Sequence, residues 1–154
     1  MNKVLSFTWS SNELAKAQNL QRQITQKDLQ LTLLEIDNRY KPIFGYYNNS
    51  SNMLSLRSIS IERNNLIYQR DNCISNAIDH ALDIIMDDIQ QNINPMFSTG
   101  NLAINNIASF IMANQISFVL SLSVRIKLSQ AIAKIANMYT ALLHFFPICY
   151  IRNN

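Results

Sequence analysis

The sequence predicts an all-α fold: a single-domain bundle of three to five helices, or an elongated bundle of a few long ones. Only two Gly and three Pro occur in 154 residues, so long stretches lack the residues that break helices most often. Apolar residues recur at spacings of three and four along much of the chain, which is typical of amphipathic helices. No charged side chain occurs from Ile89 to Val124.

A first helix is expected over about 11–40. Ser10 and Glu13 have the spacing of a capping box, which often starts a helix. Pro42 ends it, because proline disfavours α geometry in the residue before it. Between these limits runs a narrow heptad stripe of Ala17, Leu20, Ile24, Leu31 and Leu34. Such a stripe indicates packing against a partner helix. The candidate partner-binding residues are therefore Leu20, Ile24, Leu31 and Leu34.

Residues 42–52 have the composition of a loop with aromatic side chains. Phe44, Tyr46 and Tyr47 lie within four positions of each other. They are candidates for anchoring a protein partner, and the alternative is that they close the end of the bundle. A base-stacking role is disfavoured, because no Lys or Arg alternates with the rings.

A second helix is expected over about 54–92. Residues 55–61 alternate between polar and apolar and would also suit a strand, but the sequence offers no second strand for pairing. Asn94-Pro95 closes this helix. Its clearest periodic pattern consists of Ile74, Ala77, Ile78, Ala81, Leu82, Ile85 and Ile89.

Two further helices are expected over about 101–122 and 124–146. A single helix over both would be about 69 Å long, so we expect either a break near 121–124 or an elongated protein. The first of the two helices carries polar side chains on all its faces. An apolar helix without a clear amphipathic stripe is typically a buried central one, and we therefore expect the helix from about Asn101 to pack at the centre.

The charge is divided unevenly. All ten acidic residues precede Ile89, and the residues after it include Arg125, Lys127 and Lys134, which could contact an anionic membrane. The uncharged segment 102–122 is long enough to cross a bilayer, although its Asn, Gln and Ser residues make insertion costly. Nucleic acid is an unlikely partner, because the basic residues are too sparse to neutralise many phosphates.

The sequence contains no complete catalytic or metal-binding set. Asp79, Asp83 and Asp87 share one helix face beside His80, but no second cluster faces them to complete a metal site. We therefore interpret them as a solvated acidic face, with a docking face for a basic partner as the alternative. Glycine-rich phosphate loops and nucleophile motifs are also missing. We expect no enzymatic activity, no cofactor and no small-molecule substrate.

Cysteine usage and the N-terminal sequence give two further expectations. Cys73 and Cys149 lack metal-binding spacing and are expected to be buried thiols, with a disulfide left open. The N-terminal residues do not have the apolar run of a secretory signal, which makes a cytoplasmic location the default expectation.

Taken together, these features favour a helical binding or assembly protein. It would act as an adaptor, a chaperone-like protein or a structural subunit, burying a coiled-coil stripe against a protein partner or a second copy. The alternative is a membrane-active helical protein, peripherally associated, whose segment 102–122 inserts into a bilayer.

Overall fold

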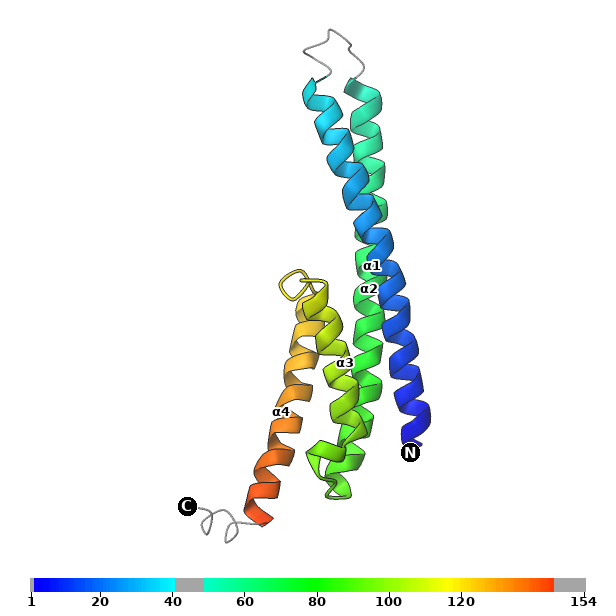
Figure 1. Ribbon diagram of the computed structural model, residues 1–154. Coiled ribbons are helices and arrows are strands. Elements are labelled where there is room, and N and C mark those ends of the chain that lie inside the picture. The colour runs from blue at the N-terminus through cyan, green and yellow to red at the C-terminus, as the bar shows by residue number, and fades with distance from the viewer. Residues whose placement is uncertain (1, 41–48, 146–154) are drawn as a thin grey trace. The chain divides into compact units, whose positions relative to one another are not determined.

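The computed structural model describes residues 2–40 and 49–145, with side chains described for 2–39 and 53–141. Its regular elements are four α-helices and one 3₁₀ turn, so the predicted all-α fold and number of helices are confirmed (Figure 1). The elements are α1 (Lys3–Tyr40), α2 (Asn49–Gln90), the turn η2 (Pro95–Phe97), α3 (Thr99–Ala113) and α4 (Leu122–Phe145).

The contacts within the chain define two compact units. The two-helix unit is Lys16–Asn72 and contains the later part of α1 and the first part of α2. The four-helix unit combines Met1–Ala15 with Cys73–Asn154, and so contains the start of α1, the end of α2, η2, α3 and α4. Each unit is described separately below.

Helix α1 begins at Lys3 rather than near Ser10. The side-chain oxygen of Asn2 accepts hydrogen bonds from the backbone N–H groups of Val4 and Leu5, at 3.1 and 3.2 Å, which is the role of an N-cap. Ser10, predicted as the cap, lies inside the helix and is buried. Its hydroxyl donates instead to the carbonyl of Ala77 at 2.9 Å and ties α1 to α2 in the four-helix unit.

The end of α2 forms the most completely buried segment of the four-helix unit. Its fully buried apolar residues are Ile74, Ala77, Ile78, Ala81, Ile84 and Ile85. Every other helix of this unit contacts it: α1 through Ser10, α3 where Gly100 meets Ile85, and α4 where Lys127 reaches Asp79. The periodic pattern seen in the sequence thus identifies the helix around which the unit is organised.

Helix α3 is the apolar helix expected from about Asn101, and it is buried along one stripe. The buried residues are Gly100, Ala103, Ile104, Ile107, Phe110 and Ile111. Asn105 and Asn106 are exposed on the opposite side. These polar residues, which show no clear periodicity in the sequence, therefore lie on a solvent-exposed face of the helix. Helix α3 is amphipathic rather than buried on every side.

Helix α3 ends at Ala113, earlier than the predicted break and without Gly or Pro. Gln115 adopts a left-handed conformation with φ of 55°. The N–H of Gln115 donates to the carbonyl of Met112 and that of Ile116 to Ile111, at 3.1 and 3.2 Å. These are the bonds of a Schellman motif, here with glutamine where glycine is usual. The end of α2 repeats the motif with Asn92 at φ 54°.

Replacing Gln115 with Gly is expected to stabilise the protein. Glycine lacks the Cβ that makes a left-handed conformation unfavourable, which stabilises the folded state. Glycine also increases the chain entropy of the unfolded state, but by less, so the free energy of unfolding should rise by about 0.5–1 kcal/mol. Thermal unfolding followed by circular dichroism measures this difference. Gln115→Ala is the control, because it keeps the Cβ and should show no such gain. A lower melting temperature for Gln115→Gly would contradict the assignment.

In the two-helix unit, α1 and α2 run antiparallel (Figure 1). Lys27 pairs with Glu62 at 2.6 Å, and the next residue in each helix, Asp28 with Arg63, also forms an ion pair. Farther along, the buried Arg70 donates to Gln21 at 2.8 Å. From Glu62 to Arg70 the residue numbers rise along α2, whereas those of their partners fall from Lys27 to Gln21 along α1, as antiparallel packing requires.

Segment 102–122 is not one helix. The turn 114–121 divides it between α3 and α4. Among the helices formed by the described residues, none combines the length and the hydropathy that a bilayer crossing requires.

Candidate interaction surface

The predicted partner-binding stripe of α1 lies mostly at the seam between α1 and α2. Ile24 is buried, whereas Leu20, Leu31 and Leu34 are half-buried in the same unit. The stripe thus faces a helix of its own chain. Phe44, Tyr46 and Tyr47 lie outside the described residues.

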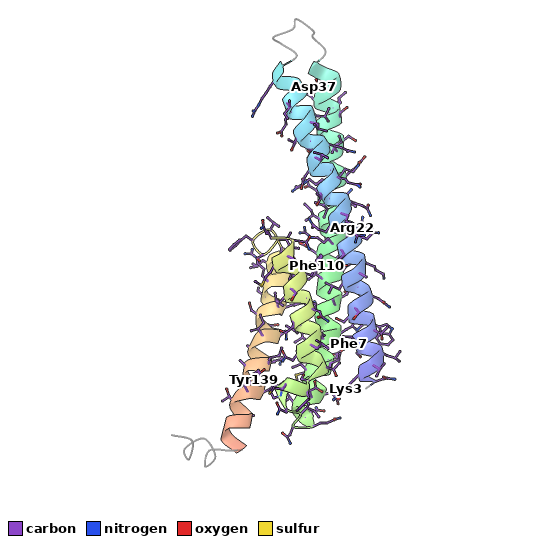
Figure 2. The ribbon with its side chains drawn as sticks, in the orientation of Figure 1. Lys3, Phe7, Arg22, Asp37, Phe110 and Tyr139 are labelled. Carbon is purple, nitrogen blue, oxygen red and sulfur yellow. The ribbon has the colours of Figure 1, made fainter. Side chains whose placement is uncertain are left out.

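A second apolar stripe on α1 is exposed. Leu29, Leu33 and Ile36 follow each other at spacings of four and three, and their exposed fractions are 59, 57 and 45%. Leu29 lies five residues after Ile24, about 140° around the helix, so this stripe is on the side away from the seam. Arg22 lies about two helical turns before Leu29, and Asp37 directly follows Ile36; Figure 2 labels both on α1. We call Leu29, Leu33 and Ile36 the outer stripe of α1.

The first part of α2 has its own outward row. Leu54, Ile61 and Tyr68 are spaced by seven residues and are all more than half exposed. Their spacing places them on one face of the helix. This row is also apolar and exposed, but its members lie about two helical turns apart and one of them is an aromatic ring. A leucine in it therefore provides a reference for experiments on the outer stripe of α1.

The three candidate membrane-contacting cations have different surroundings. Lys127 donates to Ser75 at 2.8 Å and pairs with Asp79 at 3.0 Å, so its charge is balanced within the four-helix unit. Lys134 is half-buried on α4, and Arg125 is exposed in the first turn of that helix. Of the three, Arg125 is the cation most available to an anionic partner.

The acidic row of α2 is divided among different neighbours. Asp79 pairs with Lys127, Asp87 pairs with Lys3 at 3.2 Å, and Asp83 is exposed. His80 lies against Trp9, with 5.5 Å between the ring centroids. Within the part of the chain that the structure describes, no three of the side chains able to bind a metal gather at one point. The row therefore contributes to helix packing.

The most elaborate polar cluster surrounds Asp88, whose side chain is 1% exposed. Its carboxylate accepts hydrogen bonds from Lys3, from the Ser98 hydroxyl at 2.6 Å and from the Gly100 N–H at 3.4 Å. One buried carboxylate thus joins the start of α1, the end of α2 and the start of α3. The hydrogen bond with Asp88, together with Asp87, raises the pKa of Lys3 above its ordinary 10.5.

A cavity of about 130 Å³ lies beside this cluster. It is lined by Asp88, Ile89, Asn92, Ile93, Pro95, Asn137, Met138 and Ala141. Pockets that enclose organic ligands usually measure about 300–1,000 Å³. Because the Asp88 carboxylate is bonded to groups of its own chain at the starts of α1 and α3, we interpret this cluster as a structural junction.

Comparison with known protein families, curated proteins and solved structures found no match for this chain. The surfaces and contacts described above therefore carry the functional argument.

Proposed function

We propose that this protein is a helical assembly module that associates with a second copy of itself through the outer stripe of α1. The observation that carries the proposal is the exposure of Leu29, Leu33 and Ile36 on the face opposite the α1–α2 seam. Three large aliphatic side chains at helical spacing form the kind of surface that helix-in-groove and coiled-coil recognition uses.

The charges at the ends of the stripe favour a second copy as the partner. Antiparallel packing of two α1 helices with Leu29 of one opposite Leu33 of the other places Arg22 within about one helical turn of the other copy's Asp37. Asp37 also interacts within its own chain, so this contact would add to an existing one. The same contact then forms twice around the two-fold axis. A surface that carries a cation at one end and an anion at the other complements itself only in this antiparallel arrangement.

The stripe is tested by measuring the dimer dissociation constant of the full chain by analytical ultracentrifugation. Leu33→Glu is expected to raise this constant about a hundredfold, because the change occurs twice in the dimer and each buried leucine contributes at least about 1.4 kcal/mol. Leu54→Glu is the control, since Leu54 is an equally exposed leucine on the outward row of α2. Circular dichroism verifies that both variants remain helical.

Charge exchange between copies tests the antiparallel arrangement. Arg22→Glu alone and Asp37→Arg alone should each weaken the dimer, because like charges then meet across the axis. An equimolar mixture of the two variants should recover association. A chain that stays monomeric at every concentration, or a Leu54→Glu variant that dissociates as strongly as Leu33→Glu, would refute the proposed surface.

A further inference from the structure

The turn between α3 and α4 carries a cluster of exposed apolar side chains. We name this cluster the α3–α4 apex: Met112, Phe118, Val119, Leu122 and Ile126. Phe118 is 91% exposed, the highest value among the exposed large apolar residues, and Met112, Val119 and Leu122 are all more than 60% exposed. Figure 2 shows side chains projecting from this turn into solvent. A patch of this kind marks a protein or membrane contact.

The charge around the apex favours binding to an anionic surface. Arg125 is exposed one helical turn inside α4, beside Leu122 and Ile126. No Asp or Glu occurs in the sequence after Asp88, so neither α3, α4 nor the turn between them carries a carboxylate that would repel lipid phosphates. The carboxylate of Asp79, which reaches α4 from α2, is paired with Lys127. Apolar side chains next to an exposed cation are the combination by which proteins bind anionic bilayers.

The backbone of the apex is also suited to an environment poor in water. The N–H groups of Asn114, Gln115 and Ile116 donate to carbonyls in the last turn of α3, and the N–H of Val119 donates to the carbonyl of Ile116. Backbone groups already bonded internally do not lose hydrogen bonds when they leave water, whereas unsatisfied groups make insertion costly. These four N–H groups would therefore keep their hydrogen bonds in the headgroup region.

From these three observations we infer that the α3–α4 apex inserts into the interface of an anionic membrane, with Phe118 and Val119 entering the acyl boundary and Arg125 contacting lipid phosphates. The contact requires no continuous spanning helix and leaves the four-helix unit folded. It is independent of the outer stripe of α1, which lies in the two-helix unit.

Vesicle flotation of the full chain tests the inference. We expect binding to phosphatidylcholine vesicles that contain phosphatidylserine and weaker binding to vesicles of phosphatidylcholine alone. Phe118→Asp combined with Val119→Asp should reduce the partition coefficient at least tenfold, on the order of the transfer of one large apolar side chain. Arg125→Glu should reduce binding about tenfold on the anionic vesicles only.

The matched control is Met96→Asp combined with Phe97→Asp. These two adjacent apolar residues in η2 are 77 and 78% exposed and belong to the same unit. The control should bind vesicles like the unmodified chain. Equal losses in the two double variants would indicate nonspecific adhesion and overturn the inference. So would a full chain that fails to float with either vesicle, or an apex double variant that floats like the unmodified chain.

A fluorescent probe locates the apex directly. In a Trp9→Phe background, Phe118→Trp should emit at shorter wavelength and become protected from a water-soluble quencher on adding anionic vesicles. The corresponding Phe97→Trp probe should remain accessible. An unchanged spectrum at position 118 while the protein is bound would contradict insertion by the apex.

Discussion

Replacing Gly100 with Ala is expected to lower the free energy of unfolding by about 3 kcal/mol. A Cβ built on Gly100 would lie 2.5 Å from Cγ1 of Ile85 and 2.8 Å from its backbone nitrogen. The side-chain atom could turn away, but the nitrogen belongs to the buried end of α2. Relief would therefore require α3 to move off α2. This cost outweighs the usual helix-stabilising effect of alanine, which is about 1 kcal/mol in a helix interior.

Chemical denaturation followed by circular dichroism measures this loss. Ser109→Ala, on the exposed side of α3, serves as the control and should stay within about 0.5 kcal/mol of the unmodified chain. Adding Ile85→Ala to Gly100→Ala should not restore stability, because the backbone clash remains. A Gly100→Ala variant as stable as the parent would show that α2 and α3 are not in close contact at this point.

The second large effect is expected for Lys3→Met, which removes the cation facing Asp88. Removing one member of a buried pair usually costs about 3–5 kcal/mol, because the other charge is left uncompensated. Lys3 is 25% exposed, so water screens part of the interaction, and we expect a loss of about 2 kcal/mol. Lys127→Met is the control: its partner Asp79 is half exposed, and such pairs contribute about 0–1 kcal/mol.

The contribution of Lys3 should depend on pH in a defined direction. Its pKa is raised in the folded protein above the ordinary value of 10.5, mainly by the hydrogen bond with Asp88. When the pKa of a lysine is higher in the folded than in the unfolded protein, its charge contributes fully to stability at pH values below the unfolded-state pKa. This contribution disappears as the pH rises through the folded-state pKa.

Unfolding measured from neutral pH upward should therefore show the parent and Lys3→Met converging in strongly alkaline solution. A stability difference that stayed constant through the titration of lysine would contradict the pairing with Asp88. The Lys127→Met control should show a much smaller change over the same range, because its pair is exposed to solvent.

Local patterns in the sequence predicted the helices well but not the contacts between them. Seven-residue periodicity was sufficient to place Ile24 at a helix seam, and the spacing of the isoleucines and alanines in 74–85 identified the core of the four-helix unit. The start of α1 was missed because Ser10 resembles a cap locally. Its actual partner, the carbonyl of Ala77, lies 67 residues away.

The end of α3 was misplaced for a different reason. Gln115 occupies a left-handed position that sequence rules assign to glycine or asparagine. Tertiary burial of Ile116 accompanies this turn, and no local signal in the sequence indicates it. The outer stripe of α1 does have a signal, the spacing of Leu29, Leu33 and Ile36, but its exposure became evident only when the seam was known.

The cluster around Asp88 also constrains the order in which the chain can fold during synthesis. Lys3 and Asp88 are 85 residues apart, and ribosomes add about 5–20 residues per second. The start of α1 thus waits roughly 4–17 s for its partner. Ion pairs in the two-helix unit join residues only 35 apart. The later part of α1 can therefore pair with α2 while the start of α1, up to Ala15, still lacks its partners, and this start is the last part of the helix to find them.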